Sequence, residues 1–434
     1  MELQRAKGTR DFMPEEKILR NEIVSTLKAI FERYGFYPIE TPILERFSTL
    51  SAKYAGGSEI LKETFKLTDQ GGRQLGLRYD LTVPLARFIA MNPTLKMPFK
   101  RYQIGRVFRD GPIKLGRYRE FWQCDADIVG CKDLIADVEI LQMALDAFNA
   151  LDLDVIIKLN SRKLLDEIFA YAGVPKEKRI DAILSIDKLE KFGWDYVEKE
   201  LKELGLKEDA IKTLKDIFSI KGANKEIIEN LKKILGSDSE GLKEIEEILS
   251  YFEDEKRILF TPEDEKRILF TPSLARGLAY YTGPIYEIFL QKSKITSAVA
   301  AGGRYDEMIG RFSNVKREIP ATGIAFGLDV IMDALKEKRK ELPKTKAKVL
   351  IIPIGTKKES FKLAIQLRRE GINTDLAIVE RGIKKQLEYA NALNIPYVIF
   401  YGEEELKKGK IKLKNMQTGE ETELTKEDLI NLLR

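Results

Sequence analysis

The sequence predicts an α+β fold built on an antiparallel sheet, interrupted by a helical insertion and followed by a small α/β domain. In the first 161 residues, short strand-like runs mix with helical patterns but lack the regular βαβ alternation of a parallel sheet. Residues 162–252 are instead rich in Lys, Glu, Leu and Ile, with helical periodicity. After residue 347, apolar runs such as KVLIIPI and YVIFY alternate with helical patterns again.

The first domain is predicted to begin with a helix over residues 15–34, where apolar residues recur at helical spacing and Gly35 supplies a stop. Residues 37–44 follow as an extended segment, because prolines disfavour helix immediately before them. The period of residues 133–151 predicts another helix. The strands of the predicted sheet lie between these elements, at residues 64–68, 74–79, 100–109 and 119–129.

Changes in composition and in hydrophobic periodicity along the chain predict the domain boundaries. A strand signal at 285–290 and a helix that begins near Gly327 indicate that the first domain resumes after the insertion. A Lys- and Glu-rich stretch containing Pro343 is typical of a linker. The predicted segments are the first domain in two parts, 1–161 and 253–335, the helical insertion, 162–252, the linker, 336–347, and the α/β domain, 348–434.

One segment is duplicated. The decapeptide EDEKRILFTP occurs twice in tandem, at residues 253–262 and 263–272. Ten residues are too few for a structural repeat of the solenoid kind. We interpret the copy as a local duplication that lengthens a surface loop, because loops tolerate insertion at small cost.

Composition narrows the classes of function. The formal net charge of +5 over 434 residues is too small for a nonspecific polyanion binder, so a nucleic-acid site must come from local clustering. No apolar run approaches the roughly 20 residues needed to span a bilayer, so no membrane association is expected. Cys124 and Cys131 are the only cysteines, which excludes a secreted disulfide framework and favours a cytoplasmic location.

The chain contains no histidine, which excludes His-based triads and His metal sites. It also lacks GxxxxGK[ST] and GxGxxG, so side chains would have to hold any phosphate-bearing ligand. The segment 96–119 carries eight basic residues against the single acid Asp110. Guanidinium groups there could grip two phosphate or carboxylate oxygens at once, although a solvated basic strand remains an alternative.

Two further segments carry possible ligand groups. Tyr280 and Tyr281 stand between glycine turns, four residues after Arg276, and could present phenol hydroxyls to a ligand or fill a core. The glycines of AAGGRYD (300–306) and GIAFGLD (323–329) allow close approach of a backbone, or simply tight turns.

Taken in chain order, these segments resemble the histidyl-tRNA synthetase family over essentially the whole sequence. The resemblance rests on KGTRDF (7–12), LRYDLT (77–82), Phe108-Arg109, GRYREFWQ (116–123), RGLAYYTG (276–283) and GGRYD (302–306). It implies a class II synthetase catalytic domain with a six-stranded antiparallel sheet flanked by helices, a helical insertion and a C-terminal anticodon-binding α/β domain. It also implies a homodimer in which the helix 15–34 belongs to the dimer-forming motif.

The resemblance further implies the reaction and its reactants. The carboxylate of L-histidine attacks the α-phosphorus of ATP, and the histidyl group of the adenylate then moves to tRNA(His). Arg109 corresponds to the arginine that bridges the carboxylate and the α-phosphate. Arg276 corresponds to a second arginine on that phosphate, standing where many relatives place a metal ion. Mg²⁺ is expected with ATP, but no metal site made of protein residues.

Histidine recognition is implied residue by residue. A carboxylate and a phenol can read the two different nitrogens of imidazole. The implied ligands are Asp80, Thr82 and Gln123 for the α-amino group, Asp127 and Tyr281 for the imidazole, and Tyr280 beside them.

Two positions depart from the family pattern. Gly111 stands where the second motif usually has an acid, with Asp110 one place early. Val330 stands where the third motif usually has the arginine that contacts the terminal phosphates of ATP. Arg117 and Arg304 are therefore predicted as further ATP-binding residues.

Three alternatives accompany this interpretation. A histidine-binding synthetase paralogue that regulates histidine biosynthesis would fit Val330, but not the C-terminal domain. A class II synthetase for glycine, proline or threonine would not explain RGLAYYTG. A plain RNA-binding protein would leave the histidine-binding set without a purpose.

Overall fold

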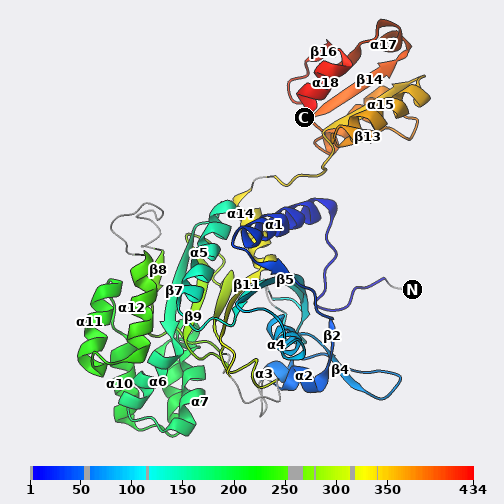
Figure 1. Cartoon of the computed structure of the whole chain (residues 1–434). Helices are drawn as coiled ribbons and strands as arrows, with labels where there is room; N and C mark the ends of the chain where they lie inside the picture. Colours follow the sequence, from blue (N-terminus) through cyan, green and yellow to red (C-terminus); the bar gives the residue numbers. More distant parts are fainter. Residues whose placement is uncertain are drawn as a thin grey trace. The chain divides into compact units, whose positions relative to one another are not determined.

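The computed structural model describes residues 3–52, 59–113, 117–252, 267–277, 280–312, 318–339 and 341–434. The chain forms two compact units (Figure 1). The first comprises Met1–Arg10 and Ile23–Lys338, and the second comprises Asp11–Glu22 and Arg339–Arg434. No helix among the described residues is long and apolar enough to cross a membrane.

An eight-stranded sheet forms the centre of the first unit, and its six central strands pair antiparallel. In spatial order these are β5 (Phe99–Phe108), β6 (Glu120–Val129), β11 (Ala321–Gly327), β10 (Ala300–Arg304), β9 (Pro284–Leu290) and β7 (Val155–Ser161). The short strands β1 (Tyr37–Pro38) and β8 (Ile268–Phe270) extend the two edges in parallel. The antiparallel core of the predicted fold class is thus confirmed, with one parallel strand added at each edge.

Three helices pack against one face of this sheet: α1 (Pro14–Arg33), α5 (Ile135–Ala150) and α14 (Leu328–Lys338). Aromatic rings join them to the sheet, because Phe326 of β11 lies between Phe31 of α1 and Phe148 of α5, with ring centroids 5.6 and 5.5 Å away. The helices predicted over 15–34 and 133–151 are α1 and α5. This face is the apolar core, which leaves the opposite face of the sheet for the site.

A second, three-stranded sheet lies beside the N-terminal part of this unit. Its strands, in spatial order, are β2 (Leu44–Arg46), β4 (Gln74–Leu77) and β3 (Lys66–Thr68). Short helices accompany it: α2 (Phe47–Ser51), α3 (Glu59–Lys62) and α4 (Thr82–Met91). The chain that leaves β4 reaches α4 through Tyr79, whose hydroxyl donates to the carbonyl of Leu50 at 2.8 Å, so the segment before α4 is tied to α2.

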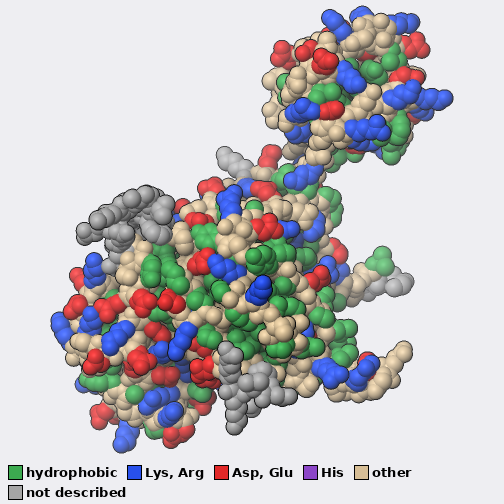
Figure 2. Space-filling view, in the orientation of Figure 1, with side chains coloured by type: hydrophobic (Ala, Val, Ile, Leu, Met, Phe, Trp, Pro, Cys, Tyr) green, Lys and Arg blue, Asp and Glu red, His purple; other side chains and the backbone are tan. Residues whose placement is uncertain are grey.

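Between β7 and β8 the described chain is helical from Arg162 to Phe252. The helices are α6 (Arg162–Tyr171), α7 (Lys176–Ile186), α8 (Leu189–Phe192), α9 (Trp194–Glu203), α10 (Glu208–Phe218), α11 (Asn224–Leu235) and α12 (Glu240–Phe252). Acidic and basic side chains are interspersed over their visible surface (Figure 2). Helices α6 and α12 approach so closely that a Cβ at Gly241 would lie 2.3 Å from the backbone nitrogen of Leu164.

The second unit carries a five-stranded sheet. Its strands, in spatial order, are β13 (Thr374–Leu376), β12 (Val349–Ile354), β14 (Tyr397–Gly402), β15 (Ile411–Asn415) and β16 (Glu421–Leu424), of which the first three are parallel. Helices α15 (Lys357–Arg369) and α18 (Lys426–Leu433) share one core with the sheet, and α16 (Ile383–Ala392) shares the other. Helix α17 (Glu403–Lys408) follows β14. The α/β architecture predicted for residues 348–434 is therefore confirmed.

The duplicated decapeptide is only partly described, because residues 253–266 lie outside the described residues. The end of the second copy is not loop, as the sequence had suggested. Its Ile268–Phe270 forms β8, whose Ile268 pairs with Ile157 of β7. The alternation of buried, exposed and buried side chains in β8 suits an edge strand over a core, which explains why an apolar ILF became part of the sheet.

Candidate active site

Alternate residues of β6 turn polar side chains to the face of the sheet opposite Phe326. Gln123, Asp125 and Asp127 share this face because side chains alternate along a strand. Their partners across β11 and β10 all have small side chains or none: Gly327, Ala325, Gly323, Ala301 and Gly303. The sequence thus forms a hollow on this face of the sheet. Polar side chains of β6 lie along one side of it, and the glycines and alanines of β11 and β10 form its floor.

Two glycines are required for this hollow. A Cβ at Gly323 would lie 1.9 Å from Oδ1 of Asp127. A Cβ at Gly303 would lie 2.9 Å from the ring of Tyr281, and the φ of Gly303 is +153°. Both positions therefore admit only glycine while Asp127 and Tyr281 keep their places.

The hollow contains a cavity of about 80 Å³. It lies where β4 leads into α4, where β5 ends, and where the loop before β9 returns to the sheet. Eight of the residues predicted from the sequence line it: Asp80, Thr82, Arg109, Gln123, Asp127, Arg276, Tyr280 and Tyr281.

Three buried acceptor atoms of the cavity residues have no hydrogen-bond partner among the described residues. They are Oε1 of Gln123, Oδ1 of Asp125 and Oδ2 of Asp127. Burial raises the pKa of Asp125 well above its usual value and raises the pKa of Asp127, whereas the charge of Arg101 opposes both shifts. Buried acceptors in native proteins are nearly always paired, so this arrangement suits a ligand that brings several hydrogen-bond donors.

The two tyrosines stand together at the other side of the cavity. Their ring centroids are 4.5 Å apart, and the Tyr280 hydroxyl donates to the Tyr281 hydroxyl at 3.5 Å. Tyr281 is buried, and the guanidinium carbon of Arg276 lies 5.6 Å from its ring centroid. Nη1 of Arg276 donates to Oε1 of Glu287 at 2.6 Å, which fixes the guanidinium next to the phenols.

Arg109 reaches the cavity from the residue that follows β5. Its Nε donates to the carbonyl of Tyr79 at 3.2 Å, and its guanidinium carbon lies 5.1 Å from the ring centroid of Phe121. The side chain is therefore oriented by the backbone and by an aromatic ring. Arg109 and Arg276 bring two positive groups into one cavity from separate parts of the chain.

The N-terminal segment supports the same region. Arg10 pairs with Asp329 at 2.5 Å and donates to the hydroxyl of Tyr118 at 3.0 Å. Asp329 also accepts from the backbone N–H of Trp122 at 3.0 Å. The acid of the GLD sequence thus joins the start of α14 to the start of β6, and Val330 follows it without a charge.

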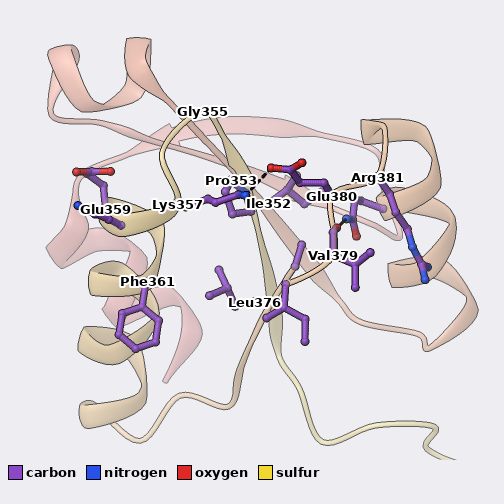
Figure 3. A pocket seen from close by; sticks show the side chains of 14 residues that line it. Ile352, Pro353, Gly355, Lys357, Glu359, Phe361, Leu376, Val379, Glu380 and Arg381 are labelled. Atoms are coloured by element: carbon purple, nitrogen blue, oxygen red, sulfur yellow. Dashed lines mark hydrogen bonds and ion pairs between the residues drawn. The ribbon is translucent and has the colours of Figure 1, made fainter.

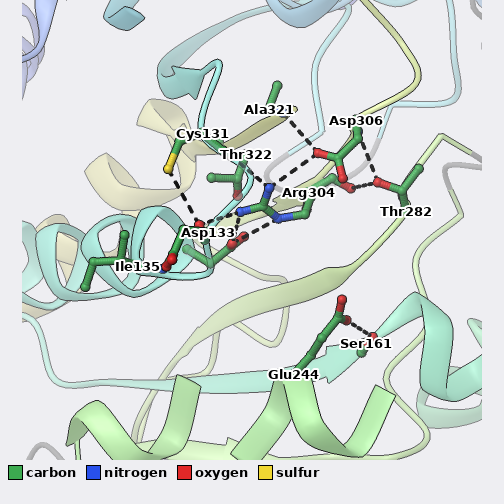
Figure 4. A network of polar contacts seen from close by, with 12 residues as sticks. Cys131, Asp133, Ile135, Ser161, Glu244, Thr282, Arg304, Asp306, Ala321 and Thr322 are labelled. Carbon is green, nitrogen blue, oxygen red and sulfur yellow. Dashed lines mark hydrogen bonds and ion pairs between the residues drawn. The ribbon is translucent and has the colours of Figure 1, made fainter. Parts of the chain in front are cut away.

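Arg304 does not line the cavity, which corrects its assignment to ATP. The side chain is 3% exposed, and protein groups hold its guanidinium (Figure 4). Nε donates to Asp137 at 3.0 Å, and the two terminal nitrogens donate to the carbonyls of Cys131 and Asp133 at 3.0 and 3.1 Å. A buried, paired arginine cannot turn to a phosphate without leaving Asp137 as a lone buried charge.

Arg117 lies outside the cavity as well, but on the surface. Its Nη2 is 3.3 Å from Oε1 of Glu63, and the side chain is half exposed. Unlike the buried pair of Arg304, this contact is a surface ion pair of the kind that contributes little free energy. Its assignment to ATP therefore stays a prediction.

Sequence reasoning did not identify Arg101, Asp125 and Tyr305 as parts of the site. Asp125 and Tyr305 line the cavity, and the hydroxyl of Tyr305 donates to Oδ1 of Asp127. The period-2 spacing of residues 123, 125 and 127 could have indicated Asp125. Only the pairing of β5 with β6 brings Arg101 to Asp127.

Comparison with known proteins agrees with this arrangement. The family model described as histidyl-tRNA synthetase matches residues 8–331, and the model described as anticodon binding domain matches residues 348–434. Histidine–tRNA ligase 1 of Bacillus anthracis is 44% identical over 439 residues, with 100% of both chains covered. The chain belongs to the histidyl-tRNA synthetase family. It is accordingly a class II aminoacyl-tRNA synthetase, a histidine–tRNA ligase.

Solved structures share the fold of the synthetase. The histidyl-tRNA synthetase of Nostoc sp. PCC 7120 has a TM-score of 0.86 and 30% identity, covering 100% of this chain and 99% of that one. A protein of Bacillus halodurans C described as an ATP phosphoribosyltransferase regulatory subunit/histidyl-tRNA synthetase has a TM-score of 0.75 and 21% identity, covering 93% and 99%. The second likeness concerns the fold alone, so the regulatory alternative is not favoured by it.

Proposed function

We propose that the synthetase activates L-histidine with ATP inside the cavity of the first unit and transfers it to tRNA(His). The observation that carries this proposal is the set of three buried acceptors that accept no hydrogen bond from the described residues, in a cavity that two tyrosines and two arginines also line. Histidine brings donors from its ammonium and imidazole groups, and its carboxylate is attracted by the arginines. One ligand thereby satisfies both charged sides of the cavity.

The ammonium group is assigned to the residues at the start of α4 and on β6. Asp80 is held there because its Oδ1 accepts from the backbone N–H of Val83 at 3.0 Å. Thr82 begins the helix, and Gln123 lies on the same side of the cavity as Asp125. This leaves the imidazole to Asp127 and the Tyr281 hydroxyl, with Tyr280 packed beside it.

Activation needs positive charge where the α-phosphate reacts. A histidine carboxylate oxygen forms a bond to the α-phosphorus, and the bond from that phosphorus to the bridging oxygen breaks, releasing pyrophosphate. Arg109 and Arg276 stabilise the negative charge that develops during this step, and their fixed positions avoid reorganisation. A ribose hydroxyl of the 3′-terminal adenosine then attacks the carbonyl carbon, and AMP leaves.

Magnesium accompanies ATP in this proposal. Mg²⁺ keeps several water ligands and binds largely through phosphate oxygens. No group of three His, Cys, Asp or Glu side chains that could hold a metal ion occurs among the described residues. Bound to ATP, the ion would neutralise the charge of the terminal phosphates. With Val330 in the usual place of an arginine, Arg117 is the proposed protein contact of those phosphates.

The second unit is proposed to bind the anticodon of the tRNA. A cavity of about 690 Å³ lies between α15 and the segment that follows β13 (Figure 3). Its lining includes Phe361, Ile378 and Val379, each more than half exposed. Arg381 also lines it, and Lys357 pairs with Glu380 at 2.5 Å. Exposed apolar surface beside cations suits unstacked bases and their phosphates.

A cytoplasmic homodimer completes the proposal. Tyr37 of β1, Leu44 of β2 and Met91 at the end of α4 are each more than half exposed. Exposed apolar side chains on neighbouring elements are typical of an interface between subunits. Sedimentation of the purified chain at micromolar concentration is expected to give twice the mass of the chain.

Charging of tRNA tests the proposed function. The purified protein, ATP, Mg²⁺ and labelled histidine are incubated with a tRNA(His) transcript or with a transcript for another amino acid. Stable acylation of tRNA(His) alone supports the proposal. Histidine binding without acylation of any tRNA would instead support the regulatory alternative.

A further inference from the structure

Arg101 is a charged side chain that lies next to the site but has no part in the mechanism above. It is fully buried in β5, directly opposite Asp127 in the register between β5 and β6. Its Nη2 is 2.7 Å from Oδ2 of Asp127 and donates to the carbonyl of Leu81 at 3.4 Å. The basic segment around β5 therefore sends one guanidinium inward, to the residue assigned to imidazole.

Asp127 is held from three sides. Arg101 approaches its Oδ2, the hydroxyl of Tyr305 donates to its Oδ1, and Gly323 leaves the space beside it. The contact with Arg101 has the distance of an ion pair but not the angle of a hydrogen bond, so Oδ2 has no hydrogen-bond partner among the described residues. The carboxyl group is thus fixed beside a positive charge, and one of its oxygens makes no hydrogen bond to the described residues.

Stability alone does not account for this buried pair. Nε and Nη1 of Arg101 also have no hydrogen-bond partner among the described residues, so the guanidinium is poorly satisfied. Buried ion pairs of this kind are often replaceable by apolar residues at no loss of stability. An apolar residue at position 101 would, however, leave Asp125 and Asp127 buried side by side without the positive charge.

The charge of Arg101 opposes the protonation of Asp127. Burial raises its pKa, the charge of Arg101 and the hydrogen bond from Tyr305 lower it, and Asp80 raises it. Asp125 lies on the same strand, and its own pKa is raised well above its usual value by burial and by the charge of Asp127, while the charge of Arg101 lowers it. Without Arg101, Asp127 would be expected to take up a proton and lose its capacity as a charged acceptor.

We propose that Arg101 is a positioning residue for histidine recognition, which keeps Asp127 ionised and aimed so that it accepts the imidazole N–H. This inference rests on the proposed function. Tyr305 assists from the other oxygen. Selectivity for imidazole then depends on a residue that does not touch the substrate.

Histidine-dependent ATP–pyrophosphate exchange with the full-length protein tests this role. Arg101→Met should raise KM for histidine about 10- to 100-fold, because a buried acceptor loses its charge. KM for ATP should stay within about twofold, since the proposed contacts of the phosphates do not include Asp127. Arg101→Lys should recover only part of the loss and leave KM for histidine about threefold or more above the wild-type value, because it keeps the charge but not its position. Arg106→Met is the matched control, because Arg106 is an exposed arginine of the same strand, paired with Glu120.

A double-mutant cycle with Asp127→Asn separates positioning from a general structural effect. If Arg101 acts through Asp127, Arg101→Met should change KM for histidine by less than about threefold in the Asp127→Asn background. Additive losses, or equal rises in KM for histidine and ATP, would overturn the inference. Wild-type protein without histidine-dependent exchange would instead refute the proposed function itself.

A second variant covers the case in which Arg101→Met does not fold, as judged by its thermal transition. In that case Arg101→Lys tests the positioning role, because lysine keeps the positive charge but places it differently from the guanidinium group. A selective rise of about threefold or more in KM for histidine supports the inference. An unchanged ratio of the two KM values contradicts it.

Discussion

Arg109 and Arg276 enter the cavity from separate parts of the chain, and each is oriented by a specific partner. Arg109 is held by the Tyr79 carbonyl, and Arg276 by Glu287. The sequence could assign both because they stand in recognisable motifs. It could not separate them from Arg304, which is equally basic in sequence but is buried against Asp137. A sequence shows which residues are charged, whereas only the fold shows which of them are paired with a buried partner of opposite charge.

Arg276→Ala should lower kcat for pyrophosphate exchange by about 100- to 1,000-fold, because one fixed charge on the transition state is lost. The thermal transition should stay close to that of the wild type. Arg311→Ala serves as a control, since Arg311 is an exposed arginine that pairs with Glu307 on the surface. Near-normal turnover in Arg276→Ala would remove this residue from the mechanism.

Gly323→Ala tests the hollow itself. The added methyl would lie 1.9 Å from Oδ1 of Asp127, so that carboxylate must move. We expect KM for histidine to rise by about tenfold or more in the exchange assay, because Asp127 would leave its acceptor position. Gly382→Ala is the control, because a Cβ there meets no atom within 4 Å. Equal KM values for the two variants would contradict the geometry.

At the scale of elements, the pairing of β5, β6, β11 and β10 creates the site. Each strand contributes alternate residues, so acids on one strand face glycines and alanines on the next two. The sequence predicted β5 and β6 as strands, whereas the segments of β10 and β11 were interpreted only as glycine-rich approaches or turns. The register of β6 with β11 was not predicted, because it joins segments that lie far apart in the chain. The antiparallel fold class was therefore predictable, and the period of 2 could have indicated Asp125, whereas Arg101 was not identifiable as a neighbour of Asp127 without the register of β5 and β6.

Arg304→Ala should act on stability rather than on ATP. Arg304 of β10 pairs with Asp137 of α5 and also contacts the loop that precedes this helix. Removing it leaves a buried carboxylate and should lower the free energy of unfolding by about 3–5 kcal/mol. Urea denaturation measures this loss. At a temperature where the variant is folded, KM for ATP should remain close to the wild-type value, and a selective rise would restore Arg304 to the ATP site.

Gly241→Ala should weaken the helical insertion. A Cβ at this position would lie 2.3 Å from the backbone of Leu164, so α12 must move away from α6. Overpacking of this kind costs about 1–3 kcal/mol in the free energy of unfolding. Hydrogen exchange of α6 and α12 should show the loss of protection, and unchanged exchange in both helices would contradict the close approach.

At the scale of the whole molecule, each unit has its own proposed function: histidine activation in the first and anticodon binding in the second. The acceptor-lined cavity lies in the first unit and the exposed apolar cavity lies in the second. The sequence predicted both architectures because the change from Lys- and Glu-rich helices to apolar parallel strands is strong. It did not predict that Asp11–Glu22 would group with the second unit, since that assignment depends on tertiary contacts.

Phe361→Ala should separate tRNA binding from activation. Loss of one stacking ring should raise KM for tRNA(His) by about 5- to 100-fold in the charging assay, while histidine-dependent exchange stays unchanged. Leu432→Ala is the matched control, because Leu432 is similarly exposed but does not line the cavity. A parallel loss of exchange in Phe361→Ala would contradict the division of work.

Amino-acid-dependent ATP–pyrophosphate exchange tests the central claim most directly. The wild-type protein is assayed with each of the twenty amino acids in turn, at saturating ATP and Mg²⁺. The cavity of acceptors, phenols and arginines predicts exchange with histidine alone, despite Val330 in the third motif. Exchange with another amino acid, or with none, would contradict the assignment of this cavity to histidine activation.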